Sequence, residues 1–251
     1  MQLFAEALGA GSPTLILLHG AGANGAVFKP LLRELAWPAR VIVPDLRGHG
    51  RSPHGKHYGL AQHAADIADL LEPNARVHVV GHSMGGAVGL ILASGLFGVS
   101  IARVSAFGVK VRWSADELAK NEAFASAPVR WFDTRAAAVE RFVRAAGLSS
   151  HVRDGDPAVA AGIVEEGHRF RLAADPATVR AGGPPVAAMV ASAQAPVRLF
   201  CGANDPMVAV EELKLLDPDA FAMEGCGHSP HVEAPDKLAA VIRGSHLVPP
   251  I

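Results

Sequence analysis

The stretch VHVVGHSMGGAVGL, residues 77–90, joins an apolar, strand-like run to a helix-like run of small residues. Ser83 lies at the junction, with Gly81 and Gly85 two positions to either side. Glycine is unfavourable inside regular structure, so we expect these glycines where a strand and a helix approach too closely for side chains. Gly-x-Ser-x-Gly in this setting is typical of a nucleophile elbow, a sharp turn that exposes the serine hydroxyl. The stretch therefore predicts Ser83 as a nucleophile, with a helix N-cap as the simpler alternative.

A serine hydroxyl becomes a good nucleophile only when a base takes its proton, so a histidine and an acid are expected later in the chain. Asp205 directly follows the strand-like run APVRLFCG, and His228 lies in the loop after the next one, AFAMEG. Both residues thus fall in loops that follow strands. Asp116 and Asp133 stay open as alternative acids, and His231 as an alternative base.

Strand-like and helix-like segments alternate over most of the chain. The strand-like runs are residues 14–20, 39–48, 75–81, 101–111, 195–202 and 220–225. The helix-like runs are residues 60–72, 84–98, 207–216 and 234–243. Such alternation predicts an α/β fold, a mostly parallel twisted sheet flanked by helices on both faces.

Residues 113–194 break this alternation. They contain the helix-like segments 114–125 and 134–147 and no convincing strand. The interval is too long for a single crossover between parallel strands, although a run of ordinary crossover helices is the simpler alternative. We therefore predict a core of residues 1–112 and 195–251, and a helical cap insertion of residues 113–194 over the carboxyl ends of the strands.

Composition excludes several classes of protein. The 251 residues are 50% hydrophobic and 19% charged, with a formal net charge of −1, so neither disorder nor nucleic-acid binding is expected. No apolar run reaches the roughly 18 to 20 residues of a membrane span, and the start lacks the pattern of a secretory signal. Cys201 and Cys226 are expected as free thiols, and the histidines fit no zinc spacing. We expect a cytoplasmic protein with no metal and no cofactor.

Five motifs contain or accompany these features: LLHGAGA, PDLRGHGRS, GHSMGG, GANDPMV and GCGHSPHVEAP. Together they make the chain similar to the α/β-hydrolase superfamily over nearly its whole length, and specifically to its cap-bearing, serine esterase-like members. The resemblance implies Ser83 as nucleophile, His228 as general base and then acid, and Asp205 as the carboxylate that orients the imidazole. It also implies an oxyanion hole made by the backbone N–H groups of Ala21 and Met84.

The resemblance favours hydrolysis of a small to medium carboxylic ester or lactone. A serine nucleophile argues against dehalogenase and epoxide hydrolase chemistry, which uses aspartate at that position. Carbon–carbon hydrolases usually show Asn and Trp where this chain has His82 and Pro230. Thioester cleavage, C–C hydrolysis, perhydrolysis and a hydrolase-fold ligand receptor with little turnover stay open. The expected partner is a small-molecule substrate, and the protein itself is expected to be a monomer or homodimer.

Aromatic residues of the predicted cap are candidates for the substrate pocket. We expect Trp113, Trp131 and Phe132 to line it, although each could equally belong to the cap's own core. Nearby arginines include Arg112, Arg130 and Arg135. Spacing alone does not say whether one of them points inward toward a substrate carboxylate.

Overall fold

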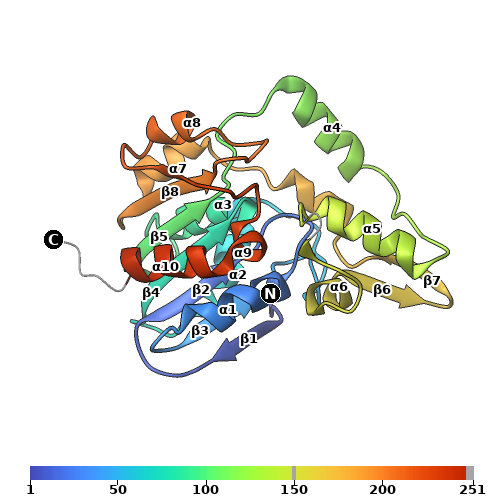
Figure 1. The fold of residues 1–251 in the computed structure, drawn as a ribbon, viewed down its shortest axis with the longest axis horizontal. Coiled ribbons are helices and arrows are strands. Elements are labelled where there is room, and N and C mark those ends of the chain that lie inside the picture. The colour runs from blue at the N-terminus through green and yellow to red at the C-terminus, as the bar shows by residue number, and fades with distance from the viewer. Residues whose placement is uncertain (149–150, 247–251) are drawn as a thin grey trace.

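A twisted seven-stranded sheet forms the centre of the computed structural model, which describes residues 1–148 and 151–246 (Figure 1). In sheet order the strands are β1 (Ala5–Leu8), β3 (Val41–Pro44), β2 (Thr14–Leu18), β4 (Arg76–His82), β5 (Ser100–Phe107), β8 (Val197–Gly202) and β9 (Phe221–Met223). All neighbouring strands are parallel except the edge strand β1, which runs antiparallel to β3. The predicted mostly parallel α/β sheet is thus confirmed.

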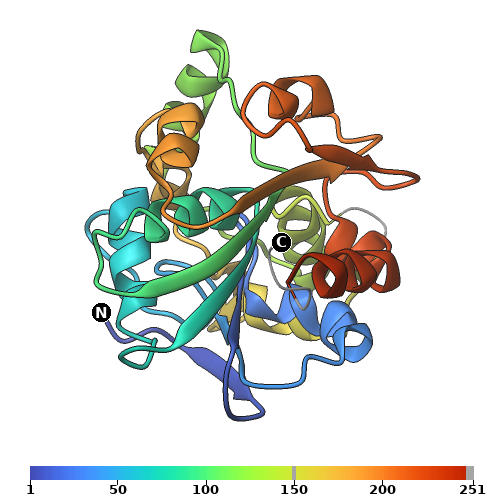
Figure 2. The same ribbon diagram turned by 90° about the vertical axis from the view of Figure 1, so that its left-hand side faces the viewer.

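Helices cover both faces of the sheet (Figure 2). One face carries α2 (Leu60–Ala68), α3 (Met84–Leu92) and α7 (Val186–Ser192); the other carries α1 (Lys29–Leu35) and α10 (Pro235–His246). Three shorter helices complete the layers: η1 (Gly25–Phe28), α8 (Val210–Lys214) and α9 (Pro230–Glu233).

The central strands explain why the sequence reads as continuous apolar runs. All five residues of β2 are buried, because helices pack on each side of the strand. Side chains alternate along a strand, so Leu15 and Leu17 join the core beneath α1 and α10. Ile16 and Leu18 join the core beneath α2 and α3. Burial of such side chains stabilises the fold by about 25 cal/mol per Å² of apolar surface removed from water.

Residues 113–194, here called the cap segment, begin after β5 and end before β8. The segment contains α4 (Ala115–Ala125), α5 (Arg135–Ala145), α6 (Pro157–Gly162), β6 (Ile163–Glu166), β7 (Arg169–Leu172), η3 (Pro176–Arg180) and α7. Ser114 caps α4 by accepting a hydrogen bond from Glu117 N–H, and Thr134 caps α5 in the same way. In Figure 1, α4, α5, β6 and β7 lie together beyond one end of the sheet.

The expectation that this segment has no strand is wrong. β6 and β7 form an antiparallel hairpin through Gly167 and His168, both with positive φ. A two-residue turn of this kind is usually predicted from an Asn-Gly or Asp-Gly pair, but here the pair is Gly-His. Each strand is only four residues long, so its sequence pattern is weak. At the other end of the segment, α7 buries Val186 and Met189 in the core between α3 and the sheet.

No helix in the part of the chain that the structure describes is long and apolar enough to cross a membrane.

Candidate active site

Ser83 occupies a strained turn between β4 and α3. Its backbone has φ 51° and ψ −117°, a conformation that residues other than glycine rarely adopt. The Ser83 N–H donates to the carbonyl oxygen of Phe107 at the end of β5, at 2.8 Å, which holds the turn against the sheet. The hydroxyl makes no capping hydrogen bond to α3, so the N-cap role does not explain this serine. Backbone strain of this kind is concentrated at functional sites.

The two glycines around Ser83 are required by close backbone approach. A Cβ atom on Gly81 would overlap the carbonyl of Gly85, and a Cβ on Gly85 would overlap the carbonyl of Leu18 in β2. Both obstacles are backbone atoms that cannot rotate away. The elbow therefore forms only with glycine at both positions, which gives a physical basis for the motif.

His228 and Asp205 meet at the carboxyl ends of neighbouring strands. His228, in the loop after β9, donates from Nδ1 to Oδ2 of Asp205, in the loop after β8, at 2.8 Å. The Asp205 carboxylate has no exposed surface, and the imidazole is 13% exposed. The other carboxylate oxygen accepts from Met207 N–H at 2.8 Å, which fixes its orientation. This pairing places the proton on Nδ1 and leaves the Nε2 lone pair of His228 available to take a proton.

The loop that carries His228 reaches the same turn as Ser83. Gly108 follows Phe107, whose carbonyl oxygen accepts the hydrogen bond from Ser83 N–H. A Cβ atom on Gly108 would lie 3.2 Å from Cε1 of His228. His82, the residue before Ser83, has its ring centroid 4.7 Å from that of His228. Ser83, His228 and Asp205 thus lie near one another at the carboxyl ends of β4, β9 and β8.

The alternative acids and the alternative base lie in different environments. Asp133 is 93% exposed beside Arg169, and Asp116 pairs with Lys120 on the surface of α4. His231 is buried against the rings of Phe28, Phe107 and His82, and neither ring nitrogen has a hydrogen-bond partner in the described residues. Its burial lowers the pKa to about 3, so the ring is neutral.

The loop after β2 brings backbone donors to the site. Nε2 of His19 accepts from Leu46 N–H at 2.9 Å, so the proton is on Nδ1, which donates to the Gly20 carbonyl at 2.8 Å. Burial lowers the pKa of this imidazole and keeps it neutral. These two hydrogen bonds give His19 a structural role, since they tie the loop after β2 to Leu46. Ala21 follows in this loop, while Met84 is the first residue of α3, where an amide N–H has no acceptor within the helix.

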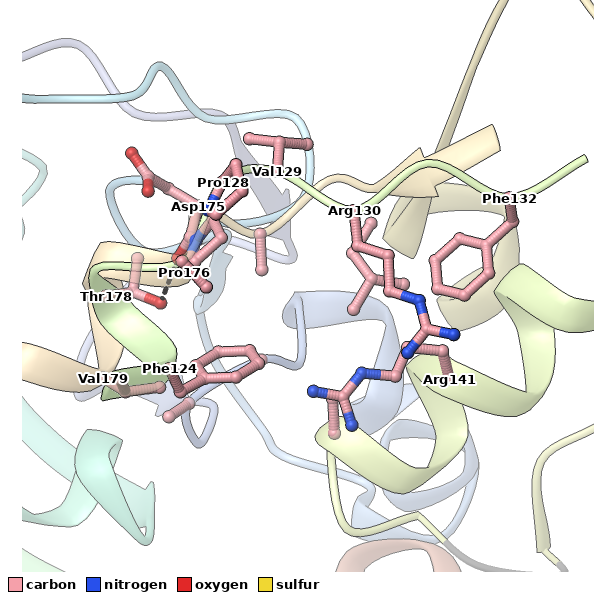
Figure 3. Close-up of a pocket in the computed structure, with 16 residues that line it drawn as sticks. Phe124, Pro128, Val129, Arg130, Phe132, Arg141, Asp175, Pro176, Thr178 and Val179 are labelled. Atoms are coloured by element: carbon pink, nitrogen blue, oxygen red, sulfur yellow. Dashed lines mark hydrogen bonds between the residues drawn. The ribbon is translucent and has the colours of Figure 1, made fainter. Parts of the chain in front are cut away.

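A cavity of about 610 Å³ extends from the Ala21–Gly22 loop beneath the cap segment (Figure 3). Of the three aromatic residues expected here, Phe132 lines the cavity, whereas Trp113 and Trp131 lie outside it. Phe132 pairs with Phe170 in an extended bridge, and consecutive side chains of extended backbone point in opposite directions. Trp131 therefore faces away and lies beneath the guanidinium groups of Arg169 and Arg171. Trp113 is 45% exposed and lies beneath Lys110.

The cavity wall also includes residues that sequence reasoning did not place there. They are mainly apolar side chains of the cap segment, together with Arg141 from α5. The sequence could have placed Arg141 in the cavity wall, because it lies on the same side of α5 as Ala138, Phe142 and Ala145. It is the charged member of an otherwise apolar helical stripe.

The two cysteines are free and buried, and burial raises the pKa of the Cys201 thiol to about 11. Among the described residues, no group of three or more His, Cys, Asp or Glu side chains is placed to hold a metal ion.

The model of the alpha/beta hydrolase family matches residues 15–241, and the chain belongs to this family. The fold agrees with the crystal structure of E-2-(acetamidomethylene)succinate hydrolase, with a TM-score of 0.80, 22% identity, and 96% of this chain and 94% of that chain covered. An esterase from Mycobacterium tuberculosis gives a TM-score of 0.76 at 20% identity, covering 99% and 92% of the two chains.

Curated relatives match over shorter segments. The magnesium-chelatase 30 kDa subunit of Rhodobacter capsulatus is 45% identical over 91 residues, which is 34% of this chain and 31% of that protein. The 2-hydroxy-6-oxo-2,4-heptadienoate hydrolase of Pseudomonas putida is 43% identical over 94 residues, covering 34% and 33%. A pimeloyl-[acyl-carrier protein] methyl ester esterase from Aeromonas salmonicida is 41% identical over 95 residues, covering 37% and 36%. The matched region thus spans about a third of each relative.

Proposed function

We propose that the protein is a serine hydrolase that cleaves a small to medium carboxylic ester or lactone through an acyl-enzyme intermediate. The observation that carries this proposal is the hydrogen bond from His228 to Asp205, formed beside the strained turn that presents Ser83. The pairing leaves the Nε2 lone pair of His228 free to accept a proton, as nucleophilic catalysis requires of the base. Hydrolases and esterases among the relatives and neighbours support the same reaction class.

The proposed reaction begins with attack of Ser83 Oγ on the substrate carbonyl carbon while His228 Nε2 takes the hydroxyl proton. Asp205 holds the imidazole in the required tautomer and stabilises its positive charge. The carbonyl oxygen becomes an oxyanion, which the N–H groups of Ala21 and Met84 would stabilise. His228 then gives its proton to the leaving alcohol. A water molecule, deprotonated by His228, then attacks the acyl carbon; the bond to Ser83 Oγ breaks, His228 returns the proton to Oγ, and the carboxylic acid leaves.

The cap segment supplies the proposed substrate pocket. Its side chains form most of the cavity wall, and Ala21 brings a proposed oxyanion donor to the same space. We propose residues 113–194 as an insertion that caps the core of residues 1–112 and 195–251, with its last helix, α7, packed in the core beside α3. Two buried, free thiols are consistent with a cytoplasmic location, which we retain as part of the proposal.

Hydrolysis of a carbon–carbon bond is the second candidate. It is favoured by the 43% identity to the heptadienoate hydrolase, although that match covers a third of either chain. The same nucleophile and base serve this reaction and thioester cleavage, so turnover of the matching substrates separates them.

The test is a panel of p-nitrophenyl acetate, butyrate, hexanoate and palmitate, lactones, a thioester and a dienoic ring-fission ketone, with wild type and Ser83→Ala. We expect ester or lactone turnover that depends on Ser83, and kcat/KM for butyrate at least tenfold above that for palmitate. A fluorophosphonate should label Ser83 stoichiometrically. Rapid labelling without turnover of any substrate would contradict the enzyme and favour a receptor; preferred turnover of the ketone would replace the ester assignment.

A further inference from the structure

Two arginines of the cap segment, Arg130 and Arg141, line the cavity. Cζ of Arg130 lies 5.0 Å from the centroid of the Phe132 ring, and Cζ of Arg141 lies 5.2 Å from that of Phe124. Figure 3 shows both guanidinium groups extending into the space between these two phenyl rings. The cavity therefore brings together two positive charges from different elements, the loop after α4 and the middle of α5.

Neither of these arginines has a carboxylate partner among the residues that the structure describes. Other arginines of the same segment do: Arg135 pairs with Asp154, Arg144 with Glu140 and Arg180 with Glu122. Among the described arginines of the segment, Arg153 also lacks such a partner, but only Arg130 and Arg141 line the cavity.

Asp175, the acidic residue of the cavity wall, is engaged elsewhere. One of its carboxylate oxygens accepts from the Tyr58 hydroxyl at 2.6 Å and the other accepts from Ala177 N–H at 2.9 Å. In Figure 3 its carboxylate points away from both guanidinium groups. The wall therefore has an excess of positive charge.

Arg130 is exposed and Arg141 is half-buried, so water solvates part of both guanidinium groups, and an anion bound between them would further reduce their mutual repulsion. A guanidinium that lies over an aromatic ring keeps its N–H donors at the edge of its plane free for a ligand. Carboxylate and phosphate groups match this donor arrangement and form strong, charge-assisted hydrogen bonds with arginine. The position of Arg141 in an apolar helical stripe indicates the same role, since packing alone would be satisfied by leucine or methionine.

We propose that Arg130 and Arg141 bind an anionic oxygen-bearing group of the substrate, a carboxylate or a phosphate, at the end remote from the bond cleaved at Ser83. The substrate class is then an ester that carries a second, acidic group. This inference rests on the proposed function, because Ala21, a proposed oxyanion donor, lines the same cavity as the two arginines.

The first test compares two esters of equal chain length. The p-nitrophenyl monoester of adipic acid carries a terminal carboxylate, and p-nitrophenyl hexanoate carries a methyl group in its place. We expect wild type to prefer the adipate ester in kcat/KM. Arg130→Gln and Arg141→Gln should each reduce the ratio of the two kcat/KM values at least tenfold, mainly through KM. Arg144→Gln, on the same helix as Arg141 but paired with Glu140, should leave the ratio unchanged.

Thermal unfolding of each variant separates a specificity effect from a merely structural one. A melting temperature within about 3 °C of wild type, combined with a lowered ratio, supports the binding role. Equal kcat/KM for the two esters in wild type, or an unchanged ratio in both arginine variants, would overturn the proposal while leaving the serine hydrolase intact.

Direct binding tests the same pair without turnover. Monomethyl adipate and pentyl phosphate are titrated calorimetrically into Ser83→Ala, alone and combined with Arg141→Gln. We expect the second substitution to raise the Kd of at least one ligand tenfold or more, and the tighter ligand in Ser83→Ala identifies carboxylate or phosphate as the preferred anion. If wild type cleaved neither ester, the proposed function would fail and this measurement would still decide the anion site. Indifference of both ligands to Arg141 would refute it.

Discussion

Nε2 of His82 donates a hydrogen bond to the carbonyl oxygen of His228 at 2.9 Å. The residue immediately before the proposed nucleophile thus holds the loop that carries the proposed base, although β5 and β8 separate their strands in the sheet. Burial, and next the neighbouring His231 and His228, lower the pKa of His82 well below its usual value. The ring is therefore neutral, and the bond places its proton on Nε2. We infer that His82 positions His228 relative to Ser83.

His82→Phe tests this positioning role. Phenylalanine preserves the aromatic packing but cannot donate to the His228 carbonyl, so the loop loses one tether. We expect kcat to fall about tenfold or more, with a loss of about 1–3 kcal/mol in the free energy of unfolding because a buried acceptor is left unpaired. Steady-state kinetics and urea unfolding measure the two effects.

His231→Phe is the matched control, because His231 lies in the same ring cluster and makes no hydrogen bond in the described part of the chain. It should keep kcat within about threefold of wild type. Similar losses in both variants would show that aromatic packing, rather than the His82 bond, positions the loop.

Ser83, His228 and Asp205 are expected to act as a unit. Ser83→Ala should lower kcat on the order of 10⁴-fold or more, and adding His228→Ala should cost little further. Asp205→Asn should lower kcat on the order of 10³- to 10⁴-fold, because the imidazole would take the wrong tautomer. Asp133→Asn, at an exposed position on the cap segment, serves as the control. An Asp205→Asn enzyme of nearly normal rate, or losses that multiply in the double variant, would contradict a shared mechanism.

The strain at Ser83 predicts an unusual order of stability. Ser83 has positive φ, which costs of order 1–3 kcal/mol for a residue with a side chain and little for glycine. Ser83→Gly should therefore be more stable than Ser83→Ala by about 1 kcal/mol or more, as measured by urea unfolding. Both variants should be inactive. A Ser83→Ala protein at least as stable as Ser83→Gly would mean that the turn stores no such strain.

Buried histidines predict a loss of stability in acid. Burial lowers the pKa of His63 to about 4 and that of His231 to about 3, whereas an unfolded chain has the ordinary value near 6.5. Between about pH 6.5 and pH 4 the unfolded state binds more protons, so the free energy of unfolding falls as pH falls, by up to about 1.4 kcal/mol per pH unit for each histidine. Above pH 7 both states hold these rings neutral and the effect is absent.

Replacing one of these histidines isolates its contribution to the pH dependence of the free energy of unfolding. His231→Phe should flatten the decline in the free energy of unfolding between pH 6 and pH 4 by about 1.4 kcal/mol per unit, measured by urea unfolding at each pH. An identical slope in wild type and variant would show that His231 is not neutral in the folded protein.

Features encoded over a few residues could be predicted before the structure. The elbow at Ser83 is recognisable because its two glycines stand at fixed positions in the sequence, although the backbone that a Cβ on Gly85 would meet belongs to β2. The central strands are recognisable because burial on both faces requires continuous apolar runs. Edge strand β1 and the β6–β7 hairpin were missed, since short strands with few apolar residues carry little pattern.

The sequence by itself determined the fold class, the family motifs and the order of the proposed catalytic residues, because periodicity and motif spacing can be recognised over short stretches of the chain. Only the tertiary structure decided which acid pairs with His228, and that His82, 146 residues earlier, holds its loop. It also decided that Phe132 rather than its neighbour Trp131 faces the cavity, and that Arg141 joins Arg130 there. The physical reason is that these contacts join segments far apart in sequence. Their approach is set by the order of strands in the sheet and, for the cavity, by how the cap segment folds.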